Sequence, residues 1–502
     1  MDTAVPVGAP VPPITLGEDP AATTDRIVAT TVEVDDALLA RLRGVCAEVG
    51  TDDAERAEAG RDWWPLAMTW ALSGQVGHRP SAVARPQTEA EVAAVLAVCH
   101  EETIPVTAAA GRSGVCGGSV PVHGGVLLDL CGLSGIRSVD RTSMVLDVQA
   151  GTFGDRLEET LRAEHEVTLG HWPQSIALST VGGWLACRSA GQLSNRYGKI
   201  EDMVIGLDVA LADGRVIHTG GAPRAAVGPD LNQVFIGSEG TLGVILGARL
   251  RLHGLPAAEQ RAAYGFASFA AANDACRRIL QRGARPAVLR VYDAIEAQRS
   301  YQTGERHVLL VLDEGDSALV AATMSVVADV CGIAEVLDEG LVGRWLEHRN
   351  DVAALESLIS KDFVVDTMEV TGRWTDLDTI YTSTLEAIGA VEATMAVSAH
   401  QSHAYPDGAC LYFTFAGRPG PDGKDEFYRA AWDAGTRAVL AHGGSLSHHH
   451  GVGLNRSRFM ATALGDAFGT LVDLKAALDP KGILNPGKLG LPSPFGEVAW
   501  PT

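Results

Sequence analysis

Short apolar runs alternate with amphipathic segments through most of the chain, and this alternation predicts the elements of the first half. Strands are expected at 82–85, 105–109, 126–130, 145–148, 203–211 and 243–252. Helices are expected at 35–49, 89–102 and 152–164. Thr88 and Glu91 form a capping box at the start of the second helix. The first half is therefore a mixture of short strands and helices with glycine and polar turns between them.

The pattern changes near Pro256. From there to about Ala441, amphipathic helices alternate with strands such as 288–292, 308–312 and 411–416, which predicts a separate α+β domain. The final segment returns to glycine-rich loops and one helix. Four parts are expected, with boundaries at 1–79, 80–255, 256–441 and 442–502. The first 25 residues are rich in proline and alanine and are expected to form a poorly ordered arm.

Composition narrows the classes of function. The 502 residues include 40 Lys and Arg against 62 Asp and Glu, a formal net charge of −22. This charge disfavours binding to nucleic acid or to anionic membranes. The eight cysteines show no C-x-x-C pair, and no run of about 18 apolar residues or signal peptide is apparent. We expect a cytoplasmic protein without an integral membrane segment, acting on a small molecule.

Three consecutive histidines provide the first candidate chemistry. His448, His449 and His450 lie between glycine pairs at 443–444 and at 451 and 453. Imidazole exchanges protons near neutral pH, so proton transfer at a bound ligand is one interpretation. A metal site or a solvated loop is the alternative. In an extended strand His449 would oppose its two neighbours, so the tripeptide must bend if His449 and His450 both reach one site.

Three glycine-rich segments provide the second candidate chemistry. They are 111–118, 179–198 and 236–243. None contains G-x-G-x-x-G or a Walker A sequence, which argues against a Rossmann or P-loop site. Their backbone N–H groups could still form an anion nest for a pyrophosphate. A large planar cofactor with a pyrophosphate tail would explain all three together, and ordinary glycine-rich turns are the alternative.

The order of these motifs resembles a known family. Ser179-Thr180-Val181-Gly182-Gly183, Arg196-Tyr197-Gly198 with Glu201-Asp202, Gly237 to Gly243 and Asn485-Pro486-Gly487-Lys488 follow one another as in the FAD-binding family of vanillyl-alcohol oxidase and p-cresol methylhydroxylase. The triple-histidine segment is most similar to the alkyldihydroxyacetonephosphate synthase branch. The resemblance implies an α+β fold: a two-lobed FAD-binding domain at 80–255, an α+β cap domain at 256–441, and a C-terminal segment that completes the active site.

The resemblance also assigns residues to the cofactor. The implied FAD contacts are Gly111, Arg112, Ser113, Gly114, Val115, Pro173, Ser179, Thr180, Gly182, Gly183, Ser189, Glu239, Gly240, Gly243 and Ile245. Some members of the family attach FAD covalently through a histidine in the first loop. Ser113 occupies that place here, so non-covalent FAD is expected. No metal is expected.

Catalytic roles are implied for Tyr412, His449, His450, Arg349 and His448. Tyr412 and the histidines would move protons, and Arg349 would hold the substrate by a fork suited to phosphate or carboxylate. Arg290 is expected to be structural or to orient substrate. Without the resemblance, Tyr412 would be interpreted as a core tyrosine and Arg349 as a surface ion-pair residue.

The implied reaction exchanges an acyl group for an alkyl group through a flavin N5 adduct, as in ether-lipid biosynthesis. The Asn485-Pro486-Gly487-Lys488 segment is more similar to the hydroxy-acid dehydrogenases of the family. A dehydrogenase or oxidase of a hydroxy acid, alcohol or amine, working by hydride transfer to N5, is therefore the alternative. A catalytically silent FAD-binding protein is the third hypothesis. The family likeness also implies a homodimer.

Overall fold

A four-stranded and a five-stranded sheet form most of the first half of the computed structural model, which describes residues 10–17, 19–352 and 354–500. Two pairs of short strands add to them: β1 (Thr24–Asp25) with β3 (Gln75–Val76), and β9 (Val167–Thr168) with β13 (His253–Gly254). The four-stranded sheet has the order β2 (Val49–Gly50), β4 (Ala82–Ala84), β6 (Val126–Asp129) and β5 (Val106–Ala109). The five-stranded sheet has the order β11 (Val216–His218), β10 (Val204–Ala210), β12 (Val244–Arg251), β8 (Val145–Gln149) and β7 (Ile136–Asp140). The four-stranded and five-stranded sheets contribute to one buried core, which includes Leu128 of β6 and Leu246 of β12.

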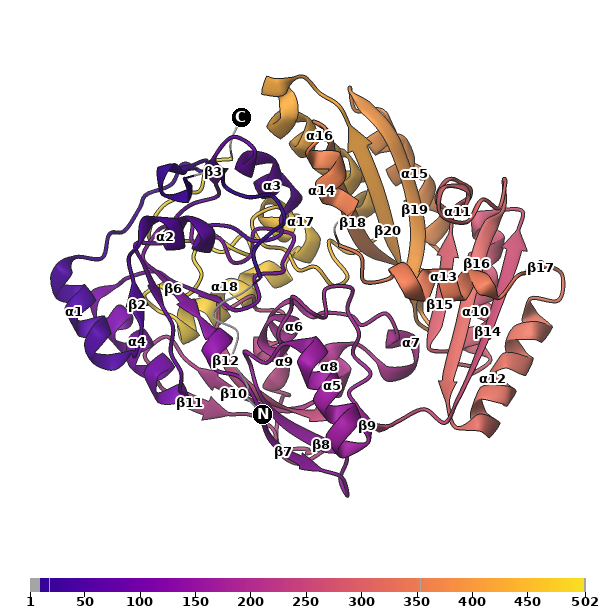
Figure 1. Ribbon diagram of the computed structural model, residues 1–502, viewed down its shortest axis with the longest axis horizontal. Helices are drawn as coiled ribbons and strands as arrows, with labels where there is room; N and C mark the ends of the chain where they lie inside the picture. The colour runs from indigo at the N-terminus through magenta and orange to yellow at the C-terminus, as the bar shows by residue number, and fades with distance from the viewer. Residues whose placement is uncertain (1–9, 18, 353, 501–502) are drawn as a thin grey trace.

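Helices link and cover these sheets. They are α1 (Asp36–Val45), α2 (Asp53–Ala59), α3 (Pro65–Ala71), α4 (Glu89–Glu102), α5 (Gly154–His165), α6 (Val181–Cys187), α7 (Ser194–Tyr197), α8 (Ile200–Met203) and α9 (Asn232–Phe235). Helix α4 starts where the Thr88 hydroxyl accepts a hydrogen bond from the backbone N–H of Glu91, at 3.2 Å. The four strands β2, β4, β5 and β6 lie near α1 and α4 on one side of the molecule (Figure 1).

A seven-stranded sheet forms the second half. Its order is β17 (Glu335–Leu337), β14 (Ala258–Phe266), β16 (His307–Gly315), β15 (Val288–Tyr292), β19 (Thr394–Ala404), β20 (Gly408–Gly417) and β18 (Val364–Arg373). Its helices are α10 (Phe269–Gln281), α11 (Ala294–Tyr301), α12 (Ser317–Val330), α13 (Gly340–His348), α14 (Ala354–Ile359), α15 (Leu377–Gly389) and α16 (Lys424–Ala441).

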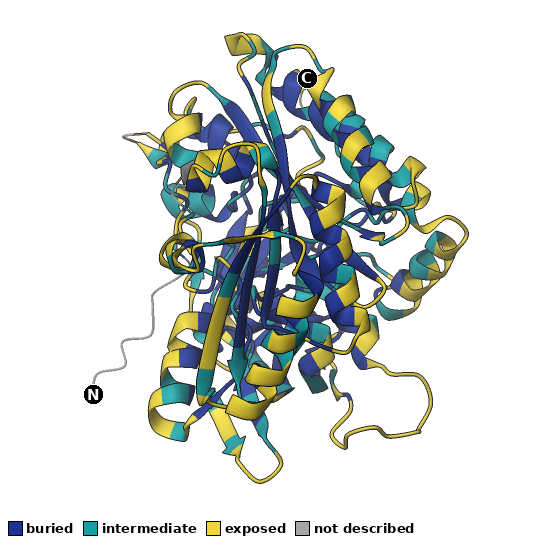
Figure 2. Ribbon diagram, turned by 90° about the vertical axis from the view of Figure 1, so that its right-hand side faces the viewer, coloured by how far each residue is buried: buried dark blue, intermediate teal, exposed yellow. Residues whose placement is uncertain are grey.

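Successive side chains along each strand point to opposite faces of this sheet. On β16, Leu309 and Val311 pack in the core beneath α10. Val308 and Leu310 point the other way, into the core shared with β10 and β12. The outward sides of the covering helices are exposed, whereas the strands behind them are buried (Figure 2). The sheet therefore presents one face to its own helices and the other to the first half of the chain.

The C-terminal segment returns to the first half. Helices α17 (Met460–Leu464) and α18 (Ala467–Leu478) are followed by a parallel bridge between Leu484 and Val106 of β5. Asn485 donates side-chain hydrogen bonds to the backbone oxygens of Gly118, at 3.0 Å, and Glu239, at 2.7 Å. One amide thus ties two of the glycine-rich segments together.

Two expectations for the N-terminal region are corrected by the structure. The described part of the arm is not loose, because Ile14 and Leu16 are buried against Met68 and other apolar side chains; residues 1–9 lie outside the described residues. The helix expected at 35–49 ends at Val45, since Val49 and Gly50 pair with β4. Among the described residues, no helix combines the length and apolar character needed to cross a membrane. The domain boundaries stay a prediction.

Candidate active site

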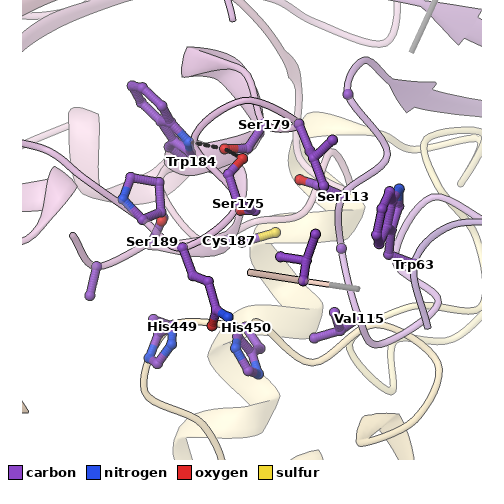
Figure 3. A pocket seen from close by; sticks show the side chains of 18 of the residues that line it. Trp63, Ser113, Val115, Ser175, Ser179, Trp184, Cys187, Ser189, His449 and His450 are labelled. Atoms are coloured by element: carbon purple, nitrogen blue, oxygen red, sulfur yellow. Dashed lines mark hydrogen bonds between the residues drawn. The ribbon is translucent and has the colours of Figure 1, made fainter. Parts of the chain in front are cut away.

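A cavity of about 810 Å³ is lined by residues from both halves of the chain. The glycine-rich segments form one wall, and strands β15, β18, β19 and β20, with α11 and α13, form another. Figure 3 shows Ser113, Ser179, Ser189 and Cys187 around the same space as His449 and His450. The volume lies towards the upper end of the range for ligand pockets, so a large ligand fits.

The glycines of the first wall leave room for a ligand to approach the backbone. A Cβ atom built on Gly114 would have only one neighbour within 4 Å, the Asp62 carboxylate at 3.7 Å, and one on Gly240 only the Ala108 Cβ, at 3.7 Å. Gly111 differs, because its Cβ would lie 2.1 Å from the backbone oxygen of Leu178. All fifteen residues that the sequence assigns to FAD line this cavity.

Several of these side chains are already engaged with the protein. Ser179 accepts a 2.7 Å hydrogen bond from the indole of Trp184, drawn in Figure 3. The hydroxyl of Ser189 lies 3.3 Å from His171 Nε2. Glu239 accepts hydrogen bonds from the backbone N–H groups of Val452, at 2.5 Å, and Gly453, at 2.8 Å. The Glu239 carboxylate therefore joins the third glycine-rich segment to the loop after the histidines, a role that the sequence did not predict.

Strand alternation positions the side chains of the second wall. On β20, Leu411 and Phe413 pack in the core under the helices, whereas Tyr412 between them lines the cavity. On β15, Arg290 and Tyr292 line it in the same way. On β19, His400, Ser402 and His403 all line it. A register shift between 401 and 403 interrupts the alternation and turns His403 towards the cavity.

Tyr412 lies among three imidazole rings. Its ring stacks on His400, with centroids 4.8 Å apart, and lies 6.1 Å from His449 and 5.6 Å from His450. The Tyr412 hydroxyl accepts a hydrogen bond from Thr367, at 3.0 Å. Burial raises the pKa of Tyr412 above its usual value, so the phenol is held protonated near neutral pH. A protonated phenol beside imidazoles can donate a proton or pass one on.

A buried carboxylate bends the histidine tripeptide. Glu369 Oε1 accepts hydrogen bonds from the backbone N–H groups of His448, His449 and His450, at 3.2, 3.1 and 2.8 Å. The Ser447 hydroxyl donates a fourth, at 2.6 Å. Because three successive N–H groups converge on one oxygen, the backbone is not extended there. This bend brings both His449 and His450 to the cavity, whereas His448 does not line it.

The charge of Glu369 is compensated by Arg456, and both side chains are fully buried. Burial alone raises the pKa of Glu369, but the Arg456 guanidinium and the contact with His450 outweigh it and hold the pKa well below its usual range. Nδ1 of His450 lies 3.2 Å from Glu369 Oε2, within ion-pair distance but without hydrogen-bond geometry. This contact leaves Nε2 of His450 to face the cavity.

His400 contacts two charged side chains, Glu296 and Arg290. Its Nδ1 lies 2.8 Å from Glu296 Oε2, and its Nε2 lies 2.5 Å from a guanidinium nitrogen of Arg290. Because arginine can only donate, Nε2 accepts and Nδ1 carries the proton. Burial and the charge of Arg290 lower the pKa of His400 to about 4, so the ring is neutral at neutral pH. His400 therefore acts as a fixed, uncharged neighbour of Tyr412.

Four arginines line the same part of the cavity: Arg290, Arg299, Arg344 and Arg349. Arg349 lies over the rings of Trp172 and Trp345, 5.3 and 5.7 Å from their centroids. Within the described ranges, only Arg299 of the four has a carboxylate at ion-pair distance, Glu296 at 3.4 Å. Burial lowers the pKa of Arg349. Arg290 and Arg349 are half-buried, whereas Arg299 and Arg344 are exposed. Half-buried cations without carboxylate partners provide a place for an anionic group.

Sequence reasoning missed several of these residues. They are Glu296, Arg299, Arg344, Thr367, Glu369, His400, His403 and Arg456. A usable signal was present in two strands. Asp366 and Glu369 lie in the strand Val364–Arg373 among valines and a methionine, and carboxylates are almost never fully buried unless they are paired. His400 and His403 are a second histidine pair close to Tyr412 in sequence.

The fold and the cavity define an FAD-dependent enzyme, and family models agree. Residues 80–220 match the model described as FAD binding domain, and residues 255–489 match FAD linked oxidases, C-terminal domain. The chain belongs to the FAD-dependent family of vanillyl-alcohol oxidase and p-cresol methylhydroxylase.

Individual relatives cover most of the chain. An alkyldihydroxyacetonephosphate synthase of Dictyostelium discoideum is 30% identical over 454 residues, which is 83% of this chain and 74% of the relative. An uncharacterised FAD-linked oxidoreductase of Escherichia coli O157:H7 is 31% identical over 82% of this chain and 89% of its own length. A solved alkyldihydroxyacetonephosphate synthase aligns with a TM-score of 0.74 at 25% identity, covering 91% of this chain and 86% of the other.

The cofactor leads to a direct prediction. Purified protein is expected to be yellow, and acid or heat should release free FAD, because Ser113 lacks the ring nitrogen through which a histidine tethers flavin. The measurement is the flavin absorbance of the supernatant after precipitation of the chain. Flavin that remains with the precipitated chain would contradict non-covalent binding.

Proposed function

We propose that the protein is an FAD-dependent enzyme that acts on an anionic small molecule by exchange of an acyl for an alkyl group, as the name of its synthase relatives suggests. One observation carries the proposal: four arginines of the second wall line the cavity that Tyr412, His449 and His450 also line. This combination of cationic anchors and proton-transfer groups suits a phosphate- or carboxylate-bearing substrate. In a chain with net charge −22, such a substrate needs a local cationic site.

Each residue has a role in this proposal. Arg349 and Arg290 hold the anionic group of the substrate, and Tyr412 with His449 and His450 removes a proton from the adjacent carbon and later returns it. Glu369 keeps Nε2 of His450 towards the cavity. The glycine-rich segments at 111–115 and 239–245 would hold the pyrophosphate and ring of FAD. Bound FAD supplies an electrophilic ring that can accept a carbon nucleophile or a hydride.

Net oxidation is the second candidate function. The likeness to an FAD-linked oxidoreductase is as high as that to the synthase, at 31% identity. The same arginines would hold the carboxylate of a hydroxy acid, and an imidazole would take the hydroxyl proton. The assignment to ether-lipid biosynthesis, the cytoplasmic location and the homodimer come from the same resemblance and stay predictions.

Anaerobic mixing of the enzyme with candidate substrates distinguishes acyl–alkyl exchange from net oxidation. The holoenzyme is mixed with an acyl dihydroxyacetonephosphate and a long-chain alcohol, and separately with D-lactate, glycolate and their homologues. Release of the fatty acid and formation of the ether product with the flavin still oxidised at the end support exchange. Stoichiometric flavin bleaching with formation of a keto acid would contradict exchange and establish oxidation.

The anchor can be tested by Arg349→Lys. Substrate binding is expected to weaken by about 1.5–3 kcal/mol, because an ammonium cannot reproduce a bidentate guanidinium fork. KM and the dissociation constant of the substrate on the oxidised enzyme provide the measurement. Arg290→Lys serves as the parallel variant, and Arg306→Lys, on the exposed Arg306–Glu335 pair, is the control. Normal affinity in both cavity variants would contradict an anionic substrate at this site.

A further inference from the structure

Two glutamine side chains reach from the first half of the chain to the segment that follows α13. Gln192 donates a hydrogen bond from Nε2 to the backbone oxygen of Arg349, at 2.9 Å. Gln174 donates one from Nε2 to the backbone oxygen of Asp351, also at 2.9 Å. All four residues line the cavity. The segment that carries Arg349 is therefore attached to the first half of the chain at two backbone oxygens.

Gln192 also holds the aromatic ring on which Arg349 lies. The backbone N–H of Gln192 donates to the backbone oxygen of Trp172, at 2.8 Å. The Arg349 guanidinium lies 5.3 Å from the centroid of the Trp172 ring. One residue thus contacts both members of this cation–π pair, Trp172 through its backbone and Arg349 through its side chain.

The two loops that carry the glutamines pack closely against each other. A Cβ atom built on Gly191 would lie 2.6 Å from the backbone nitrogen of Trp172. Only glycine lets the backbone at 191–192 approach the segment 172–174 so closely. The place of Gln192 relative to Trp172 is therefore determined by backbone packing, and the Gln192 side chain places Arg349 in turn.

The side-chain amide of Gln192 has one orientation in this arrangement. A backbone oxygen can only accept, so the amide nitrogen must face the oxygen of Arg349. Oε1 of the same amide has no hydrogen-bond partner within the described ranges of the chain. A side chain of similar length without a donor, such as methionine, would leave the Arg349 oxygen without this contact.

We propose that Gln192 positions Arg349, the anchor for the anionic group, by holding its backbone at a fixed place beside Trp172. The inference rests on the proposed function, because Arg349 is an anchor only if the substrate is anionic. An arginine whose backbone and guanidinium are both held in the free enzyme loses less freedom when the anion binds. Gln192 is a positioning residue in this proposal, since it acts through Arg349.

The binding test uses Gln192→Met in the FAD-loaded enzyme, with the substrate that anaerobic mixing identifies, an acyl dihydroxyacetonephosphate or a hydroxy acid. KM and the dissociation constant are expected to rise about 3- to 10-fold, the scale of one neutral hydrogen bond. kcat should change little, because Tyr412 and His450 lie on other segments. Gln281→Met is the matched control: Gln281 donates to the backbone oxygen of Pro406, at 3.0 Å, and does not line the cavity. Unchanged KM and dissociation constant in Gln192→Met would overturn the proposal.

A double variant shows whether Gln192 acts through Arg349. Gln192→Met combined with Arg349→Lys should bind substrate no more weakly than Arg349→Lys alone, because the fork that Gln192 positions is already absent. Fully additive effects would overturn the proposal, since they would indicate a separate contact of Gln192 with substrate or FAD. Normal affinity in Arg349→Lys would contradict the proposed function, and the measurement below then decides on Gln192 by itself.

That measurement needs no substrate. In holoprotein labelled with fluorotryptophan, the Trp172 fluorine signal is assigned by its loss in Trp172→Phe. Arg349→Met should shift this signal, because a cation over the ring acts on its electrons. Gln192→Met should shift it in the same direction, and Gln281→Met should leave it in place. A Trp172 signal that does not move in Gln192→Met, or that moves in the opposite direction, would overturn the proposal.

Discussion

Replacing His450 by alanine is expected to lower kcat about 100-fold or more while the FAD content stays close to that of wild type. This is the scale of losing a positioned acid–base group. His450 lines the cavity from the C-terminal loop, and Glu369 contacts its Nδ1. Steady-state kinetics and the flavin-to-protein absorbance ratio provide the measurement.

Tyr412→Phe is expected to show a loss of the same size, because the phenyl ring keeps its stacking on His400 and only the hydroxyl is removed. His307→Gln is a suitable control, since His307 lies on β16 and does not line the cavity. Activity close to wild type in either cavity variant would remove that residue from the mechanism. Loss of FAD in step with activity would indicate a role in cofactor binding instead.

Glu369→Gln is expected to destabilise the fold and to lower activity together. Removing one partner of a buried ion pair costs about 3–5 kcal/mol, because Arg456 is left as an uncompensated buried charge. The amide oxygen can still accept N–H groups, so the loss is mainly that of the charge. The measurement is denaturant unfolding of the holoprotein with parallel kinetics at a temperature where the variant is folded. Glu335→Gln, which breaks the exposed pair with Arg306, should cost no more than about 1 kcal/mol.

The same carboxylate predicts a dependence of stability on pH. The pKa of Glu369 is depressed in the folded state, so its stabilisation is fully present above its unfolded pKa, about 4.3. It is lost as the pH falls towards the folded pKa. Wild type should therefore lose stability more steeply than Glu369→Gln below about pH 4.3. Parallel curves for the two proteins in acid would show that Glu369 is not ionised in the fold.

Regular elements were the most predictable part of this protein. The helix at 89–102 and the strand at 288–292 were predicted with the bounds that the structure has. In both cases local signals determine the outcome: a capping residue at the helix start and a run of apolar residues in the strand. The helix expected at 35–49 was too long, because pairing of Val49 with β4 depends on a strand more than thirty residues later in the chain.

The glycine-rich wall was also predictable, since it consists of continuous segments whose order is typical of the family. The resemblance carried by these motifs implied FAD as the cofactor and the family, which are confirmed, and it assigned Tyr412, His449 and His450 to one site; the three line one cavity. Each motif is a short continuous segment, so its turn chemistry and alternation can be recognised locally, and the order of the motifs along the chain carries the resemblance.

Only the tertiary structure decided how the site is held. Glu369 and His403 come from two strands, Glu296 from helix α11 and Arg456 from a loop, and no local pattern connects them with the histidine tripeptide. The bend that brings His449 and His450 to the cavity results from a carboxylate 79 to 81 residues earlier in the chain. A buried charge must find its partners wherever the fold provides them, and those partners are neighbours in space and not in sequence.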